Sequence, residues 1–290
     1  MTQQLYARIQ EQAASHSIIE LCRLYSVSRS GYYKWLRRGG QPNRYEKAQR
    51  QLDKHVEDIH SHYPSMGYRQ IKDTLLLQTG WVVCDLSVWR SMQRLHIQGY
   101  VRKSKSPSHP GQEHDVHPNL LNRAFRAALP LQKVVSDITY INHRGKWYYL
   151  ICFLDLFNNE VVEWELTSSF DVLPVIQSAK RLLDKAKCTE FPVLLHSDQG
   201  IQYTSSAYQT LLKQYNAVQS MSRAGTPRDN AVIESFFGRF KDVLRVQFRY
   251  REHHNLHQVI SQAIHYFNHI RPIRKLNGKP PVQFRIEQVA

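Results

Sequence analysis

Three acidic residues have the types and positions needed to bind metal ions together: Asp137, Asp198 and Glu234. Asp137 lies in a run rich in β-branched residues, 134–141, which predicts a strand. Asp198 closes the apolar segment 191–198 and is expected at the carboxyl end of a second strand. Functional groups of α/β sheets are usually found at such ends. We therefore expect the two aspartates to lie on one sheet.

Glu234 is expected on a helix that Asp229 or Asn230 would cap. The predicted buried stripe of this helix consists of Ile233, Phe236, Phe237, Phe240 and Leu244. Glu234 lies about 100° around the helix from the first of these, at the edge of the stripe. Lys241 follows seven residues after Glu234 and returns to nearly the same azimuth. A carboxylate and an ammonium group therefore share one open face.

Carboxylates brought together repel one another unless a cation neutralises them. Mg²⁺ prefers such hard oxygen ligands, and two ions about 3.5–4 Å apart can activate an attacking oxygen and stabilise a leaving one in phosphodiester chemistry. We expect Asp137, Asp198 and Glu234 to be the catalytic residues and to bind two Mg²⁺ ions, for which Mn²⁺ could substitute. Any one of these acids alone is more often an ion-pair partner or a solvated residue, so the prediction depends on all three.

The loop 222–228 leads into the helix that carries Glu234 and contains Arg223 and Arg228. Arginines next to a helix N-terminus are suited to bind a phosphate. We expect Arg223, Arg228 and Lys241 to bind DNA beside the acidic residues. The alternative is a surface turn whose arginines are only solvated.

The elements that would position these residues follow a mixed α/β pattern. Strands are predicted over 134–141, 147–156, 160–166 and 191–196, with a helix over 172–186 before the last strand. Three meandering strands, a helix and a further strand are the order of an RNase H-like sheet. We expect an α/β, RNase H-like catalytic core, with a mixed five-stranded sheet and flanking helices, preceded by a small all-α helix-turn-helix region.

The N-terminal region is predicted to contain two short helices, 18–25 and 31–38, joined by a serine-rich turn, which is typical of a helix-turn-helix. Ser28 or Ser30 could cap the second helix. The basic residues that we expect to contact DNA phosphates are Arg29, Lys34, Arg37 and Arg38. An ordinary helical hairpin with a solvated basic face is the alternative.

Four regions are expected along the chain. Apolar residues at helical spacing predict a second helical DNA-binding unit, and a segment with three prolines after residue 103 predicts a linker. The expected boundaries are 1–50 for the helix-turn-helix-like region, 51–105 for the second helical unit, 106–118 for the linker and 119–290 for the catalytic core with a C-terminal helical tail.

The composition favours a globular protein with a polyanionic partner. The chain has 290 residues, 42% of them hydrophobic, and a formal net charge of +15. It has no run of 18 apolar residues and no signal peptide, so we expect a cytoplasmic protein without membrane contact. The four cysteines form no CxxC pair, which argues against a disulfide framework and a zinc knuckle.

A zinc site remains as a weaker alternative. It could use His60, His62 and Cys84, or His265 and His269, which lie at helical spacing. An integrase-type zinc site needs a CxxC pair, which the chain lacks. Solvated or packed histidines are therefore favoured.

The sequence resembles the DDE transposases of the IS3 family of bacterial insertion sequences and, more distantly, the retroviral integrases. The segments that resemble the three catalytic blocks of the family are 137–140, 196–200 and 229–237. Between Asp198 and Glu234 lie 35 residues, which matches the DD(35)E spacing, and Lys241 matches the basic residue seven positions after the glutamate. The resemblance extends over residues 18–284. Val134 and Ile273 depart from it, where the family usually has Trp and often His.

The resemblance implies an enzyme that cleaves DNA at the ends of its element with water as the nucleophile. The liberated 3′-OH would then attack target DNA, without a covalent protein intermediate. Implied partners are DNA, further copies of the chain in a homo-oligomer on DNA, and an upstream-frame protein or a frameshift fusion to it, since many members are downstream-frame products.

Two other functions compete with this interpretation. A non-catalytic DNA-binding regulator would explain the basic charge but not the three spaced acids. A two-metal nuclease of the RNase H-like class would use similar carboxylates, and strand-transfer activity would distinguish it from a transposase.

Overall fold

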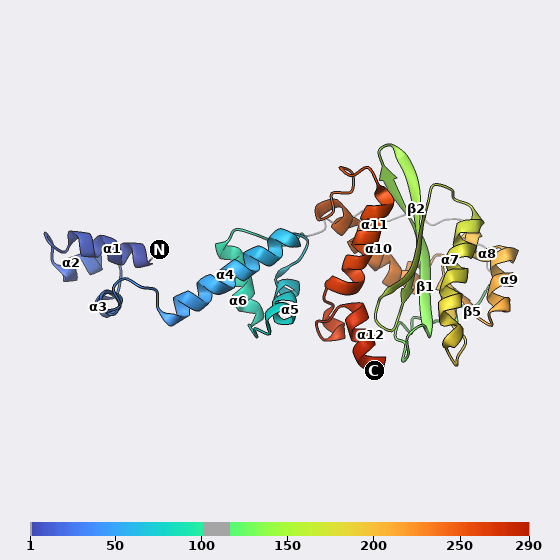
Figure 1. The fold of residues 1–290 in the computed structure, drawn as a ribbon, viewed down its shortest axis with the longest axis horizontal. Coiled ribbons are helices and arrows are strands. Elements are labelled where there is room, and N and C mark those ends of the chain that lie inside the picture. Colours follow the sequence, from blue (N-terminus) through green and yellow to red (C-terminus); the bar gives the residue numbers. More distant parts are fainter. Residues whose placement is uncertain (1, 101–116, 290) are drawn as a thin grey trace.

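The structure is a computed structural model that describes residues 2–100 and 117–289. The expected linker, 106–118, lies outside the described residues except for its last two positions. Figure 1 shows a chain of three parts: a small N-terminal group of helices, a second helical unit and an α/β core. No helix among the described residues has the length and apolar character needed to cross a membrane.

The core is built on a five-stranded mixed sheet. Its strands are β1 (Lys133–His143), β2 (Lys146–Asp155), β3 (Val161–Thr167), β4 (Leu194–Ser197) and β5 (Val218–Met221). Their order is β3-β2-β1-β4-β5, with β1–β2 and β2–β3 antiparallel and β1–β4 and β4–β5 parallel. The predicted hairpin is present, and Arg144 and Gly145 adopt positive φ angles of 52° and 80° in its turn. The mixed five-stranded sheet is confirmed.

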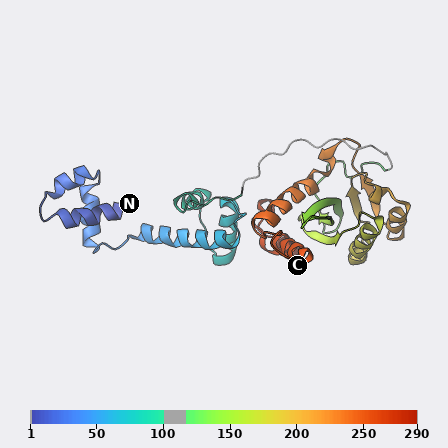
Figure 2. The same ribbon diagram turned by 90° about the horizontal axis from the view of Figure 1, so that it is seen from above.

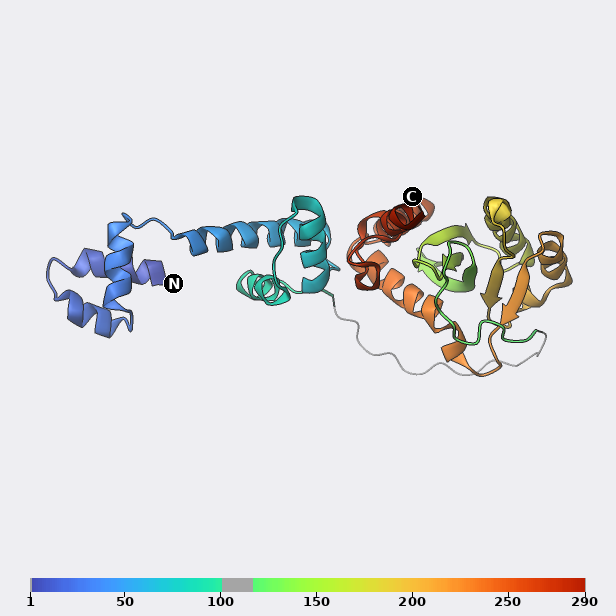
Figure 3. The ribbon, with the colours of Figure 1, turned by 90° about the horizontal axis from the view of Figure 1, so that it is seen from below.

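Helices cover both faces of the sheet because successive strand residues point to opposite sides. Val134 packs with the helices of one face: α7 (Val172–Lys185), η1 (Ala186–Cys188), α8 (Ile201–Thr204) and α9 (Ser206–Gln214). Val135 packs on the other face against α10 (Ala231–Val246) and α11 (Leu256–His265). Figures 2 and 3 show the sheet between these two groups of helices.

The C-terminal tail follows α11 on the same side of the sheet. It contains a π-helical turn, η3 (Tyr266–Ile270), a short 3-10 turn, η4 (Arg274–Leu276), and a last helix, α12 (Pro281–Val289). Asn268 joins the tail to β3, because its side chain accepts from the backbone N–H of Val161 and donates to the carbonyl of the same residue, both at 2.9 Å. The tail therefore packs as part of the α/β core.

The N-terminal unit is a bundle of three helices with its own small core. Its helices are α1 (Thr2–Gln12), α2 (Ile18–Leu24) and α3 (Arg29–Arg37). Its buried residues are Ile9, Leu21, Cys22, Tyr32 and Trp35. Of the two expected caps, Ser28 and Ser30, it is Ser28 that caps α3: its hydroxyl accepts from the backbone N–H of Gly31 at 3.4 Å. The sequence reasoning did not anticipate α1.

The second unit consists of α4 (Arg44–His62), α5 (Tyr68–Thr79) and α6 (Asp85–Arg94). A capping box fixes the start of α4, because Asn43 accepts from the backbone of Glu46 at 2.8 Å and Glu46 accepts from the backbone of Asn43 at 2.7 Å. One helix therefore crosses the boundary expected after residue 50. Gly80, with a φ of 70°, follows the last turn of α5.

This second unit packs on the α/β core. The ring of Tyr63 stacks on Tyr266 of the tail, with centroids 5.6 Å apart. Ser65 donates to Gln247 at 2.8 Å, and Arg274 pairs with Asp85 at 2.5 Å. Apolar residues of α4, α5 and α6 belong to the same hydrophobic cluster as α10 and α11. The second helical unit and the core thus share one apolar cluster, unlike the N-terminal unit.

Candidate active site

Asp137 lies in the middle of β1, opposite Cys152 of β2. Its side chain is half-buried, and one carboxylate oxygen accepts from the backbone N–H of Ile138 at 2.8 Å. The backbone of Asp137 is held in place because β1 is the central strand of the sheet and pairs with both β2 and β4. The carboxylate is therefore held on a rigid element.

Asp198 directly follows β4, at the carboxyl end of that strand as the sequence predicts. Its side chain accepts from the backbone N–H of Gly200 at 3.0 Å. The buried His196 imidazole lies 2.9 Å from the hydroxyl of Ser220 and 3.2 Å from that of Ser222. Burial lowers the pKa of His196 to about 4, so the ring is neutral. It joins the strand end that carries Asp198 to β5.

Glu234 lies in the first turn of α10 and its side chain is exposed. The expected capping by Asp229 or Asn230 is absent, since Asn230 stands at the N-cap without a side-chain cap hydrogen bond. Asp229 is fully buried and pairs with Arg123 at 2.7 Å and with Arg223 at 2.8 Å. The arginines provide stronger partners than the helix N-terminus for a buried carboxylate. The two ion pairs position the start of α10.

The three acidic residues interact electrostatically. Burial raises the pKa of Asp137 to about 8, and the charges of Asp198 and Glu234 contribute to the increase, while Lys241 opposes it. Burial, followed by the charge of Asp198, also raises the pKa of Glu234. Burial raises the pKa of Asp198. The fold thus brings carboxylates from β1, the end of β4 and α10 into range of one another.

The donor set of three carboxylates fits a hard divalent cation, since a cation would offset the burial of all three and the repulsion that adds to the raised pKa values of Asp137 and Glu234. Within residues 2–100 and 117–289, however, no three or more His, Cys, Asp or Glu side chains are arranged to hold a metal ion. Asp137, Asp198 and Glu234 are close enough to interact electrostatically, but they do not form a ready set of metal ligands. The zinc alternative gains no support, and His265 stacks on His269 with ring centroids 4.5 Å apart.

The basic residues predicted near the acids differ in their surroundings. Lys241 is half-buried and close enough to Asp137 to lower its pKa. Arg228 is exposed in the turn η2 (Pro227–Asn230), just before α10. Arg223 donates two hydrogen bonds to the carboxylate of Asp229, at 2.8 and 2.9 Å, so its guanidinium has a structural partner.

The other predicted DNA-binding residues lie on the N-terminal unit and are all exposed. They are Arg29, Lys34, Arg37 and Arg38. In Figures 1 and 2 this unit lies at the end of the molecule opposite the sheet. The fold does not bring these four residues together with the acidic residues.

Comparisons with known proteins extend over most of the chain. Two integrase core domain families match, over residues 127–227 and 215–281. Transposase InsK for insertion sequence element IS150 from Escherichia coli (strain K12) is 34% identical over 271 residues, which cover 92% of each chain. Transposase InsF for insertion sequence IS3A from the same strain is 30% identical, over 91% of this chain and 90% of InsF.

The chain belongs to the family of insertion-sequence transposases. A chain of the simian T-cell lymphotropic virus intasome, solved in complex with the PP2A regulatory subunit B56 gamma, has a similar fold. The TM-score is 0.51 and the identity 16%, over 79% of this chain and 74% of that chain. The expected integrase-like, RNase H-like fold of this transposase is confirmed, as is its helical N-terminal region.

An aromatic group beside the acids of the transposase was not anticipated as a feature of the site. Tyr140, Tyr149 and Phe170 form it, with ring centroids between 4.9 and 6.1 Å apart. Burial, Tyr149 and then the nearby charges of Asp137 and Asp198 raise the pKa of Tyr140. Tyr140 belongs to one of the motif segments, but nothing in the sequence indicates that Phe170, 30 positions away, would join it.

Proposed function

We propose that this transposase cleaves DNA at the ends of its insertion sequence and joins the freed 3′-OH to target DNA by in-line attack on a phosphodiester. Asp137, Asp198 and Glu234 are the catalytic residues of this proposal. The observation that carries it is the electrostatic coupling of these three carboxylates, from β1, β4 and α10, on the sheet of a transposase family member.

The three carboxylates would hold two Mg²⁺ ions, with Mn²⁺ able to substitute. Bound there, the ions would supply activation of the attacking oxygen and stabilisation of the leaving oxygen. Asp137 would give up the proton that its raised pKa lets it keep at neutral pH. The exposed Asp198 and Glu234 side chains would turn toward Asp137, which stays fixed in the sheet.

Lys241 and Arg228 are proposed to orient DNA at this site. Lys241 lies about two turns along α10 from Glu234, on nearly the same azimuth, so its ammonium group would meet a phosphate next to the acids. Arg228 precedes the same helix and adds a cation at its N-terminus. Arg223 is proposed as a weaker contact because Asp229 holds its guanidinium.

The proposed partners are the element ends, target DNA and further copies of the chain. The N-terminal unit and the second helical unit are proposed to bind DNA ends, with Arg29, Lys34, Arg37 and Arg38 as phosphate contacts. An upstream-frame partner or fusion is not supported by the comparisons and stays a prediction of the resemblance alone.

A cleavage and joining assay tests the catalytic assignment. The full chain is incubated with Mg²⁺ and duplex DNA that carries the ends of its element, and nicked and joined products are separated. We expect Asp137→Asn, Asp198→Asn and Glu234→Gln each to lower cleavage by more than about 10³-fold, since each removes a charged ligand. Binding of the same DNA should stay within about threefold of wild type. Retained cleavage in any of the three variants would refute the assignment.

The same assay separates the two alternative functions. A regulator would bind the DNA and leave it intact with either Mg²⁺ or Mn²⁺. A nuclease would cut it but would not join the 3′-ends to a second duplex. Joined products that form with Mg²⁺, and that do not form when EDTA is present from the start, support the transposase.

A further inference from the structure

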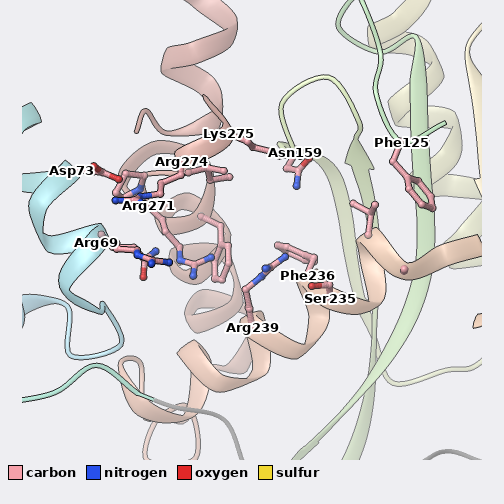
Figure 4. A pocket seen from close by; sticks show the side chains of 16 residues that line it. Arg69, Asp73, Phe125, Asn159, Ser235, Phe236, Arg239, Arg271, Arg274 and Lys275 are labelled. Carbon is pink, nitrogen blue, oxygen red and sulfur yellow. Dashed lines mark hydrogen bonds between the residues drawn. The ribbon is translucent and has the colours of Figure 1, made fainter. Parts of the chain in front are cut away.

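A cleft with a volume of about 560 Å³ lies between the second helical unit and the catalytic core. Its walls come from α5, from α10 and from the tail around η4, as Figure 4 shows. The charged residues that line it are Arg69, Asp73, Arg239, Arg271, Arg274 and Lys275. Five of these six are cations, and they come from three elements that are far apart in the sequence.

Two of the arginines have no acidic partner. Within the part of the chain that the structure describes, no carboxylate lies at ion-pair distance from Arg239 or Arg271. Arg271 packs over the ring of Phe267, with its guanidinium carbon 4.8 Å from the centroid. Arg69 and Arg274 differ, because both lie at ion-pair distance from Asp85, at 4.0 and 2.5 Å, and Lys275 donates to the amide of Asn159 at 2.6 Å.

The cations of the cleft repel one another. Burial lowers the pKa of Arg271, and the charge of Arg239 adds to this effect, although Tyr266 opposes it. Burial and then the charge of Arg239, with that of Arg126, lower the pKa of Lys275. Positive groups held together in a partly desolvated cleft are stabilised by an anion placed between them. The cleft therefore favours a negatively charged ligand.

The shape of the cleft favours an extended anion. A second cleft, of about 500 Å³, shares Arg69, Gln70, Arg239 and Arg271 with the first and continues along α5 and α10. In Figure 4 the side chains of Arg69, Arg239 and Arg271 extend from facing elements into the shared space. Arginine guanidinium groups bind phosphates through paired hydrogen bonds. Arg69, Arg239 and Arg271 line both clefts, so a chain of phosphates that runs from one cleft into the other would pass all three guanidinium groups.

We propose that this interdomain cleft binds the sugar–phosphate backbone of DNA, held jointly by Arg69 of α5, Arg239 of α10, and Arg271 and Lys275 of the tail. The proposal rests on the proposed function only in taking DNA as the substrate. The cleft begins next to the acidic site along α10, because Ser235 follows Glu234 directly and Arg239 lies about 7.5 Å along the helix axis from Glu234. DNA in the cleft connects the second helical unit to the catalytic core.

The test measures the salt dependence of DNA binding by the full chain. Arg239→Gln, Lys275→Gln and the double variant are compared with wild type by fluorescence anisotropy, with duplex DNA over a series of NaCl concentrations. Each lost phosphate contact should reduce the slope of log K against log salt by about 0.9, and the double variant by about 1.8. Lys180→Gln is the matched control, because it removes one exposed charge from α7, on the opposite face of the sheet. Its slope should stay at the wild-type value.

Two further measurements keep the result interpretable. Thermal melting reports whether each variant is folded, and Arg239→Lys, which keeps the charge, should restore most of the slope. Slopes for Arg239→Gln and Lys275→Gln equal to that of Lys180→Gln would overturn the proposal.

Inorganic phosphate, added at constant ionic strength, tests for a small-anion pocket. Stabilisation of wild type by phosphate, with DNA binding unchanged in the variants, would also overturn it. Neither outcome would alter the cleavage results for Asp137, Asp198 and Glu234.

Discussion

Helix α10 lies beside two charged clusters, one acidic and one basic. On one side Glu234 lies within electrostatic range of Asp137 and Asp198, and on the other Arg239 lines the interdomain cleft together with its other cations. The acidic cluster is positioned by the sheet, through β1 and the end of β4. The basic cluster depends on the contact between the second helical unit and the tail. The first is therefore built into one domain, whereas the second exists only when two parts of the chain are packed together.

This comparison predicts that a neutral amide at position 137 stabilises metal-free protein, because the folded state must otherwise hold a proton that the unfolded chain releases at neutral pH. Asp137→Asn should raise the free energy of unfolding by about 2 kcal/mol at neutral pH, allowing for the solvent that reaches this half-buried side chain. The amide oxygen of Asn can still accept the bond from Ile138. Thermal or urea unfolding in EDTA measures the change. A destabilised but folded Asp137→Asn variant would contradict the raised pKa of Asp137 on which this prediction depends.

The sign of the pH dependence follows from the raised pKa of Asp137. In the folded state Asp137 keeps its proton up to about pH 8, whereas the unfolded chain loses it near 3.8. The folded state therefore binds more protons between these values, and the stability of metal-free protein should fall as pH rises through this window. Asp137→Asn should flatten the curve, and Mg²⁺ should stabilise wild type more at the alkaline end.

A second prediction distinguishes the two sides of α10. Lys241→Ala should lower strand transfer about tenfold at saturating DNA, or about 1.4 kcal/mol, because its ammonium group acts beside the acids. Arg239→Gln should instead weaken DNA binding and leave the rate at saturation nearly unchanged. Lys180→Ala is the control and should change the rate by less than about twofold. Equal effects of Lys241→Ala and Lys180→Ala would mean that the reaction senses only total charge.

The smallest effect is expected in the N-terminal unit, whose buried apolar residues, among those that the structure describes, form a cluster separate from that of the core. Arg37→Gln and Arg38→Gln should each weaken duplex binding by about threefold or less, because exposed phosphate contacts are screened by salt. Cleavage of pre-bound DNA should not change. Anisotropy titrations and single-turnover cleavage measure the two quantities. A loss of cleavage at saturating DNA would show that this unit acts on the catalytic step.

The sequence predicted the elements that have a strong local pattern. The hairpin of β1 and β2, the helix α7 and the apolar stripe of α10 follow directly from residue periodicity. The strand β5 was not located, because its four residues, Val218–Met221, alternate too briefly to be distinguished from a loop. Asp137, Asp198 and Glu234 could be singled out because all three belong to one region of the chain and 35 residues separate the second from the third, as in the family motif.

Partners that are distant in the sequence could not be inferred. Asp229 or Asn230 was expected to cap α10, but Asp229 instead forms an ion pair with Arg123, 106 positions earlier. His196 links the end of β4 to β5 by hydrogen bonds with Ser220 and Ser222, and no local sequence pattern indicates those bonds. The basic cleft likewise combines positions 69, 239 and 271, which only the docking of two units brings together.

The capping box at the start of α4 has a consequence for the distance between the two helical units. It lets α4 run as one helix of 19 residues, which at about 1.5 Å per residue makes a rod roughly 28 Å long. B-form DNA advances about 3.4 Å per base pair, so this rod matches roughly eight base pairs. A duplex lying along α4 would meet α1–α3 at one end and α5 at the other, a little less than one helical turn apart.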